Sequence, residues 1–260
     1  MEPIRYVFVG GLHRSGTTLV ASLLEAHSEV RGLSAAPVPE GEGVFLQGAI
    51  PHDALAGVPG QFAERPEMHL TEGCRFDSAA VRDRLRSDWD LWYPPGGRWR
   101  VENSPVNLLR ARLYQQLFPA SQFVFVTRHP LAVARATAKW SDRGEAALLG
   151  HWSRAHELLL GDLPYLHNWM VIRFEDLCAR PESEIARLFA FLSLDPPAAA
   201  PIVDGGRGGA YLDQGPPEGP CPGAAAFGYD LRARAPAVPC PVPGAHWFRD
   251  VREAITRPPA

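Results

Sequence analysis

The residues most suited to chemistry lie in a loop near the start of the chain. Between Gly11 and Thr18 it reads G-L-H-R-S-G-T-T, so it keeps the glycine spacing and the final hydroxyl of the phosphate-binding pattern G-x-x-x-x-G-K-[ST]. Thr17 takes the place of the lysine, which argues against an ordinary NTPase. Arg14 supplies a cation instead, and its planar guanidinium suits the oxygens of a phosphate or sulfate group. We therefore predict an anion site formed by Arg14, Ser15, Gly16, Thr17 and Thr18.

This loop must be preceded by a strand and followed by a helix if it is to face an anion. The apolar run 4–9 predicts a buried strand, and the apolar spacing from Thr17 onward predicts a helix. The N-terminus of that helix and the backbone N–H groups of the loop then point at the anion. A purely structural glycine turn is the alternative interpretation.

A second basic residue follows the clearest strand of the sequence, at 122–127. Its continuous β-branched and aromatic residues predict burial on both faces. Arg128 comes directly after this strand, before a His-Pro turn and the start of a helix. It is therefore placed to bind a second phosphate at the same edge of the sheet. An ordinary surface arginine is the alternative.

Another short strand, 98–102, brings polar residues to this edge. It ends in Glu102, followed by Asn103 and Ser104. Glu102 could be mistaken for the metal-binding carboxylate of phosphate-loop NTPases, but no aspartate follows the strand in the usual apolar context. The sequence therefore predicts no metal site.

Strands and helices alternate over most of the chain. We expect helices at 131–140 and 145–160, a strand at 169–173 and a helix from Pro181. A helical pattern also follows Pro105, with Val106, Leu109, Leu113 and Leu117 on one face. This order predicts an α/β fold of the P-loop type, a parallel β-sheet flanked by helices on both faces, with ligands at the carboxyl ends of the strands.

Residues 196–260 differ in composition from the rest of the chain. They hold 13 of the 26 prolines and 9 of the 24 glycines, so only short elements are expected there, at 224–231 and 247–255. We divide the chain into an α/β domain, 1–195, and this Pro/Gly-rich C-terminal region.

The C-terminal region is either a lid over the α/β domain or a partly ordered tail. A lid is favoured for its first part, because Arg207, Gly208, Gly209 and Tyr211 are residue types that suit contact with a ligand. The last twenty or so residues are expected to be dispensable.

Composition sets the outer limits. With 260 residues, 46% of them hydrophobic, the chain can bury one sizeable core. A formal net charge of −3 gives no sign of nucleic-acid binding. The first strand begins almost at the N-terminus and no apolar run approaches membrane-spanning length, so we expect a soluble, cytoplasmic protein. The four cysteines lack metal-binding spacing, which favours buried or incidental thiols.

Three ordered motifs resemble the sulfotransferases that use 3′-phosphoadenosine 5′-phosphosulfate (PAPS), particularly a bacterial branch near the tyrosylprotein and heparan types. The segment 12–19 is similar to that family's 5′-phosphosulfate loop. The segment 128–137 is similar to its 3′-phosphate segment, and 171–177 is similar to the strand signature that follows. The resemblance covers roughly residues 4–194.

The resemblance implies in-line transfer of a sulfuryl group from PAPS to a hydroxyl or amine of a small-molecule or natural-product acceptor. The product is 3′-phosphoadenosine 5′-phosphate (PAP), and no metal is implied. Arg14 and the loop amides would stabilise the leaving phosphate, because fixed cations and N–H groups can neutralise its growing charge. Arg128 and Thr137 are the implied contacts of the 3′-phosphate, and we add Arg207 as a further cofactor contact.

Two positions depart from the family's pattern. Ala136 stands where many relatives carry a serine, eight positions after the 3′-phosphate arginine, and Thr137 offers a hydroxyl one position later. Asn103 stands where many relatives carry a lysine, so it can donate a hydrogen bond but brings no positive charge. Stabilisation of the leaving group then rests more heavily on Arg14, or activity is low.

The general base is sought in the segment 38–43, near where the tyrosylprotein enzymes place a catalytic glutamate. Glu42, between two glycines, is preferred over Glu40, because a partly desolvated carboxylate there can accept the acceptor's proton. His13 and His129 are alternatives, since each flanks an anion-binding residue and histidine titrates near neutrality. A solvated acidic loop is the interpretation without a catalytic role. The predicted catalytic residues are thus Glu42, Arg14 and His13.

Two other functions compete with this one. A P-loop kinase of a small molecule would need a loop lysine, a magnesium-binding aspartate and ATP. A non-catalytic nucleotide-binding homologue is slightly favoured by Asn103 and Ala136. The acceptor and the oligomeric state are not indicated.

Four aromatic residues, Trp89, Trp92, Tyr93 and Trp99, could form a wall of an acceptor site. In a segment of alternating charge such residues more often anchor a core, and we favour that interpretation.

Overall fold

Five parallel strands form the centre of the protein, in the order β2-β3-β1-β4-β5. The computed structural model describes residues 4–52, 59–197, 208–236 and 238–242. The strands are β1 Arg5–Gly11, β2 Val30–Arg31, β3 Trp99–Glu102, β4 Gln122–Thr127 and β5 Trp169–Arg173, and every neighbouring pair is parallel. The predicted parallel sheet is confirmed. The two residues of β2 were not predicted, because a strand this short has no periodicity to detect.

Two central strands, β1 and β4, place aromatic and β-branched side chains on opposite faces of the sheet. In β1, Tyr6 and Phe8 enter one core cluster, while Val7 and Val9 enter the other. β4 repeats this division with Phe123 and Phe125 on the aromatic face. Successive residues of a strand point to opposite faces, so the continuous apolar runs mark strands that are buried on both sides.

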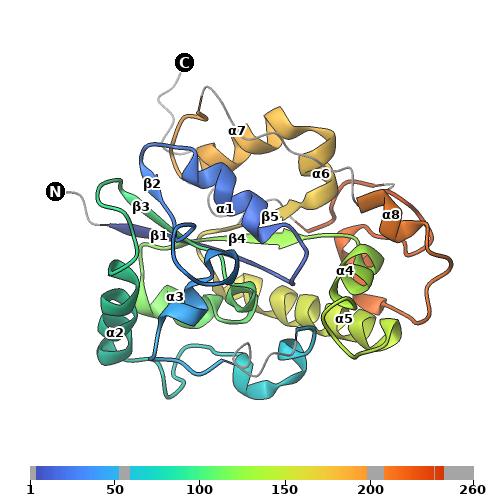
Figure 1. Ribbon diagram of the computed structural model, residues 1–260, viewed down its shortest axis with the longest axis horizontal. Coiled ribbons are helices and arrows are strands. Elements are labelled where there is room, and N and C mark those ends of the chain that lie inside the picture. The colour runs from blue at the N-terminus through green and yellow to red at the C-terminus, as the bar shows by residue number, and fades with distance from the viewer. Residues whose placement is uncertain (1–3, 53–58, 198–207, 237, 243–260) are drawn as a thin grey trace.

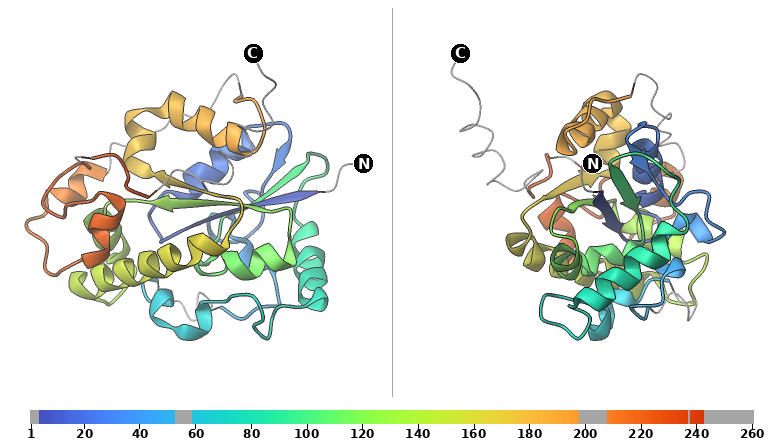
Figure 2. Two further views of the ribbon diagram at one scale, coloured as in Figure 1. Left: turned by 180° about the vertical axis from the view of Figure 1, so that it is seen from behind. Right: turned by 90° about the vertical axis from the view of Figure 1, so that its left-hand side faces the viewer.

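Helices cover both faces of the sheet, as predicted (Figures 1 and 2). α1, α6 and α7 lie on one face, and α2, α3 and α5 lie on the other. α4 and α8 lie beyond the carboxyl end of β4 (Figure 1). The bounds are α1 Thr17–Glu25, α2 Ala79–Asp90, α3 Ala111–Leu117, α4 Pro130–Thr137, α5 Glu145–Asp162, α6 Phe174–Ala179, α7 Pro181–Phe191 and α8 Gly208–Leu212.

The helical pattern after Pro105 forms two elements instead of one. A 3₁₀ helix covers Pro105–Leu109, and α3 begins after Arg110. Asn107 explains the change, since its Nδ2 donates to the Val9 carbonyl oxygen at 3.1 Å and to the Glu102 carbonyl oxygen at 3.2 Å. These bonds hold the segment against the ends of β1 and β3, where a regular α-helix would not reach both carbonyls.

α2 was not predicted, because its surface is almost entirely polar. Only Leu85 and Trp89 are buried among its residues, and the Ser78 hydroxyl caps its N-terminus by accepting from the Val81 N–H at 3.3 Å. Trp89, Tyr93 and Trp99 are all buried. The core interpretation is therefore confirmed for these three aromatics, whereas Trp92 is partly exposed.

In the described part of the C-terminal region the elements are short. A 3₁₀ helix at Pro222–Phe227 forms in place of the expected element at 224–231. The expected element at 247–255 and Arg207 lie outside the described residues. Among the residues that are described, no helix has the length and apolarity needed to cross a membrane. All four cysteines are free thiols, and Cys221 is buried.

Candidate functional site

The loop between β1 and α1 packs closely against β4 and against the start of α6. Gly16 has a φ of 103°, and a Cβ atom there would come within 2.8 Å of the Phe174 ring. A Cβ atom on Gly11 would come within 2.5 Å of the Val126 carbonyl oxygen. Glycine is therefore required at both positions. The first N–H groups of α1, which have no partner within the helix, point out of this loop.

The hydroxyl groups of the loop differ in their surroundings. The Ser15 hydroxyl is buried without a hydrogen-bond partner, while the Ser15 N–H donates to the Leu12 carbonyl oxygen at 3.0 Å. Thr17 is also buried. Thr18 Oγ1 donates to Glu40 Oε2 at 3.1 Å. An unsatisfied buried hydroxyl costs free energy, so the loop fits an anion whose oxygens would accept from it.

Arg14 and Arg128 lie side by side at this edge. Arg128 Nη1 donates to the Arg14 carbonyl oxygen at 2.9 Å. The Arg128 guanidinium lies 4.3 Å from the Phe174 ring centre, and that of Arg14 lies 4.8 Å from the Trp140 ring centre. The predicted juxtaposition of the two cations is thus present in the structure.

In the described part of the chain neither of these two arginines is ion-paired, although the charge of Glu175 acts on Arg128. By contrast, Arg135 pairs with Glu145 and Arg173 pairs with Asp176. Burial is the main cause that lowers the pKa of Arg128. A buried cation without a counter-ion is costly, so this edge fits a ligand that carries negative charge.

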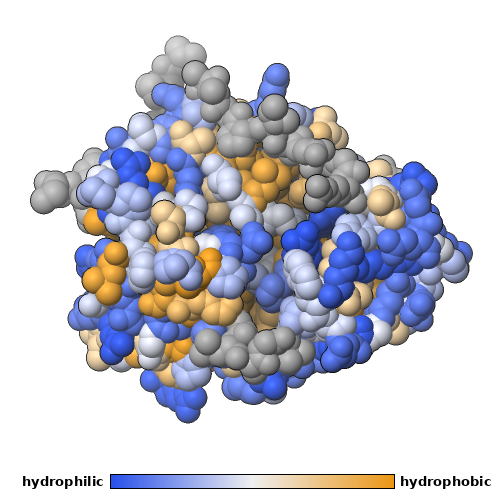
Figure 3. Space-filling view, viewed as in Figure 1, coloured by the Kyte–Doolittle hydropathy of each residue, from blue (hydrophilic) through white to orange (hydrophobic). Residues whose placement is uncertain are grey.

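A pocket of about 370 Å³ adjoins Arg128. Its walls come from α4, α6 and α8 and include Ala132, Phe174, Cys178, Gly209 and Leu212. In Figure 3 hydrophilic residues cover the right-hand side of the face shown, where Figure 1 places α4 and α8. The lining also includes two arginines, Arg128 and Arg234, and one carboxylate, Glu175. This combination of apolar and charged groups suits a nucleoside phosphate.

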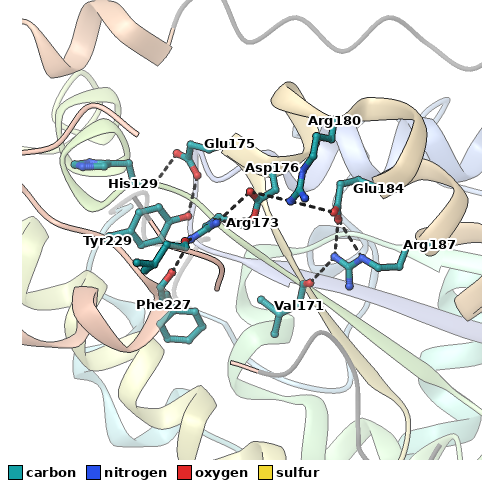
Figure 4. Close-up of polar contacts among 11 residues, drawn as sticks. His129, Val171, Arg173, Glu175, Asp176, Arg180, Glu184, Arg187, Phe227 and Tyr229 are labelled. Carbon is teal, nitrogen blue, oxygen red and sulfur yellow. Dashed lines mark hydrogen bonds and ion pairs between the residues drawn. The ribbon is translucent and has the colours of Figure 1, made fainter. Parts of the chain in front are cut away.

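The signature after β5 holds the Arg128 turn in place (Figure 4). Glu175 accepts from the His129 N–H at 2.9 Å and from the Tyr229 hydroxyl at 2.8 Å. Arg173 Nη1 donates to the Val238 carbonyl oxygen at 3.1 Å. The signature therefore joins the Arg128–His129 turn to the C-terminal region, a role that sequence reasoning missed.

His129 is enclosed by these contacts. It is completely buried, and its Nε2 donates to the carbonyl oxygens of Asp230 and Ala233, each at 3.1 Å. Burial lowers its pKa. This burial and the two hydrogen bonds of Nε2 argue against His129 as the general base.

Glu42 and Glu40 occupy different environments. Glu42 is only 7% exposed, and burial, followed by the charges of Glu102 and Glu40, raises its pKa to about 8. Glu40 is exposed and has a φ of 52°. Its carboxylate accepts from Thr18 at the mouth of the loop. The two carboxylates therefore differ in burial and in position, and the raised pKa of Glu42 is the kind of perturbation found in catalytic acids and bases.

The backbone around Glu42 is tied to the end of β3. Gly43 N donates to Glu102 Oε1 at 2.8 Å, and Trp89 Nε1 donates to the Gly43 carbonyl oxygen at 2.9 Å. Asn103 Nδ2 donates to the Glu40 carbonyl oxygen at 3.1 Å. Asn103, the residue in the family's lysine position, therefore positions the glutamate loop in this protein.

His13 lies within the loop, and the Phe62 ring contacts both His13 and His151. The Phe62 ring centre is 5.9 Å from that of His13 and 5.0 Å from that of His151. His13 Nδ1 is buried without a partner, and burial together with the Arg14 charge lowers its pKa to about 4. His13 is thus neutral at pH 7 and a weak base.

Thr137 is the other residue predicted to contact the 3′-phosphate. It ends α4, is 3% exposed, and its methyl group faces Gly60.

Several histidines whose pKa values are lowered by burial should make the protein sensitive to acid. Burial lowers the pKa values of His13, His52 and His156 from 6.5 to about 4 and that of His151 to about 3. Between pH 6.5 and pH 4 these histidines are protonated in the unfolded chain but neutral in the folded chain. The free energy of unfolding therefore falls as the pH is lowered from 6.5 toward 4. We expect a loss on the order of 1–2 kcal/mol per histidine between about pH 7.5 and about pH 5, measured by urea unfolding. His151→Gln should reduce this loss, and the exposed His167→Gln should not.

Fold and site together define a class of protein: an α/β protein with a parallel sheet, a glycine loop of the phosphate-binding type and two arginines at the carboxyl edge of the sheet. The comparisons with known proteins narrow this class. The model of the Sulfotransferase family matches residues 6–197, and the chain belongs to this family.

A curated relative and two solved structures illustrate the similarity. Protein-tyrosine sulfotransferase 2 of Gallus gallus is 23% identical over 207 residues, which are 72% of this chain and 51% of the relative. The chain thus spans about half the length of that relative. The sulfotransferase STF9 from Mycobacterium avium aligns with a TM-score of 0.50 and 12% identity over 76% of this chain and 66% of that one. The sulfotransferase domain of the Synechococcus PCC 7002 olefin synthase has a TM-score of 0.47 and 19% identity over 75% and 74%.

Proposed function

We propose that this protein transfers a sulfuryl group from PAPS to a hydroxyl or amine of a small acceptor by in-line displacement. The observation that carries the proposal is the pair of cations, Arg14 and Arg128, neither ion-paired among the described residues, beside a glycine loop with a buried, unpartnered Ser15 hydroxyl. Family membership selects sulfuryl transfer among the reactions that such an anion site can support.

In this proposal different residues bind the 5′-phosphate, bind the 3′-phosphate with the nucleoside, and accept the acceptor's proton. Arg14, the N–H groups at the start of α1 and the loop hydroxyls are placed to stabilise the 5′-phosphate as its charge grows. Arg128 and the pocket beside it are placed for the 3′-phosphate and the nucleoside. The bound donor would supply an activated sulfuryl group, and Glu42 would accept the acceptor's proton.

Glu40 would give up a contact when the donor binds. Its carboxylate accepts a hydrogen bond from the Thr18 hydroxyl. Thr18 is also one of the residues that we propose to bind the donor's phosphate. A bound phosphate would repel the Glu40 carboxylate, because both groups carry negative charge. The phosphate would then accept the hydrogen bond of the Thr18 hydroxyl in place of Glu40. This competition supports Glu42, not Glu40, as the base in the loaded enzyme.

Ligand-induced thermal stabilisation tests the proposal. We expect PAP to raise the melting temperature, with a stabilisation of about 2.7 kcal/mol at a hundredfold excess over its dissociation constant. ATP should act weakly and without dependence on magnesium. A clear shift with magnesium-ATP but none with PAP would contradict the proposal and favour a small-molecule kinase. PAP binding without consumption of PAPS across a panel of alcohol, phenol and amine acceptors would favour a non-catalytic homologue.

A further inference from the structure

Lys139 is the single lysine in the 260-residue chain, and it stands beside the anion site. It follows α4 by two residues and is exposed. Its Nζ lies 3.0 Å from the Tyr211 hydroxyl oxygen and 4.9 Å from the centre of the Tyr211 ring. In the described part of the chain no carboxylate pairs with Lys139, so it resembles Arg14 and Arg128 in carrying a charge without a counter-ion.

The Tyr211 side chain lies near enough to Lys139, Arg14 and Arg128 for all three charges to act on its phenol. The hydrogen bond from Lys139 is the main cause that lowers the pKa of the Tyr211 phenol, and the charges of Arg14 and Arg128 lower it further. Trp140, next to Lys139 in sequence, stacks on Arg14. Three like charges gathered around one phenol repel each other, and a bound anion would relieve that repulsion.

α8 does not depend on Lys139 for its attachment. Arg135, which is ion-paired with Glu145, donates from Nη1 to the Tyr211 carbonyl oxygen at 2.7 Å. Gly209 and Leu212, on either side of Tyr211, line the pocket beside Arg128. Tyr211 is thus held at this pocket by its backbone, which leaves the Lys139 ammonium group available to a ligand.

We propose that Lys139 is the third cation of the donor site, and that its ammonium group and the Tyr211 hydroxyl together bind a phosphate group of the donor nucleotide. This inference rests on the proposed function. It also accounts for a departure noted in the sequence: Asn103 brings no charge and binds the Glu40 carbonyl, so the missing cation is supplied from the end of α4.

The single lysine makes a direct test possible. Reductive methylation with ¹³C-formaldehyde labels only Lys139 and the N-terminal amine, and the Lys139→Arg variant identifies the lysine signal by its loss. We expect the Lys139 signal to shift during titration with PAP and to saturate with the dissociation constant measured by calorimetry. An unmoved Lys139 signal at PAP concentrations that saturate the protein by calorimetry would overturn the inference.

Affinities of variants separate ligand contact from a structural tether. We expect Lys139→Gln to weaken PAP binding about five- to tenfold at low salt, with a smaller effect at high salt, and Lys139→Arg to restore most of it. The matched control is Arg154→Gln, which removes an exposed cation from α5 that is already near Glu157. Reduced stability of Lys139→Gln with parental PAP affinity would show a tether and overturn the inference. Failure of the parent protein itself to bind PAP would overturn the proposed function first.

Discussion

Replacing Glu42 with glutamine should lower turnover by roughly a hundredfold or more while leaving PAP binding nearly unchanged. Glutamine keeps the shape of the side chain but cannot accept the acceptor's proton. The loss should be largest with alcohol acceptors and smaller with phenols, because a phenol is easier to deprotonate. Steady-state rates with one acceptor of each kind, together with calorimetric PAP titrations, would measure both effects.

The same substitution should change the pH dependence of the rate. The pKa of Glu42 is raised to about 8, with burial as the main cause, so the base is protonated below that value. In the parent protein kcat/KM should therefore rise with pH through about 8, and Glu42→Gln should lack this rise. A parental profile without a rising limb near pH 8 would contradict the assignment.

The pH dependence of the free energy of unfolding reports the raised pKa of Glu42 without the need for an acceptor substrate. The folded carboxyl group keeps its proton up to about pH 8, while the unfolded one loses it near 4.5. Stability is therefore lost as the pH rises through this window, and Glu42→Gln should be more stable than the parent above it, on the order of 2–4 kcal/mol. Urea unfolding below and above the window measures the difference.

Glu40→Gln is the control for these experiments. It removes the neighbouring carboxylate of the same loop, which is exposed and bonded to Thr18, and should change turnover little. Parental turnover of Glu42→Gln with an alcohol acceptor, alongside an inactive His13→Ala, would move the base to His13.

Arg128→Ala should weaken PAP binding on the order of 1.5–3 kcal/mol by removing a charge-assisted contact. It should also reduce the preference for PAP over an adenosine nucleotide without the 3′-phosphate, because only the doubly phosphorylated ligand uses Arg128 fully. Calorimetry with both ligands measures this ratio. Parental affinity for both would show that the 3′-phosphate lies elsewhere.

Arg14→Ala should act mainly on turnover. Its guanidinium is exposed at the loop, where charge grows on the leaving phosphate, so the rate should fall on the order of a hundredfold with a smaller change in PAP affinity. Arg180→Ala is a suitable control, since this exposed arginine lies near Asp176 and Glu184 and away from the loop. An equal loss of rate in both variants would show a general effect of charge.

The parallel sheet and the anion loop could be predicted because their signals are local. β4 and β5 occupy the expected residues, and α1 begins at the expected Thr17. Strands buried on both faces must be continuously apolar, and a loop this tight needs glycine at Gly11 and Gly16. Such requirements leave marks in a short stretch of sequence.

Contacts between distant segments could not be read in this way. Glu102 and Gly43 are 59 positions apart and bond at 2.8 Å, and Glu175 and Tyr229 are 54 apart and bond at 2.8 Å. The residues that flank each partner in the sequence give no sign of the distant contact. α2 was missed for a related reason, since a polar helix that buries only two side chains shows little apolar periodicity.

The amino-acid order alone therefore predicted the parallel sheet that the structure shows, together with the edge and the residue types for which we propose an anion site. Packing decided which of those residues can perform their roles. The two glutamates of one loop differ because one is buried beside Glu102 and the other is exposed beside Thr18. Likewise, His129 and Thr137 are enclosed by segments far away in the sequence. Solvation and the neighbouring charges set proton affinity and access, and both depend on the whole fold.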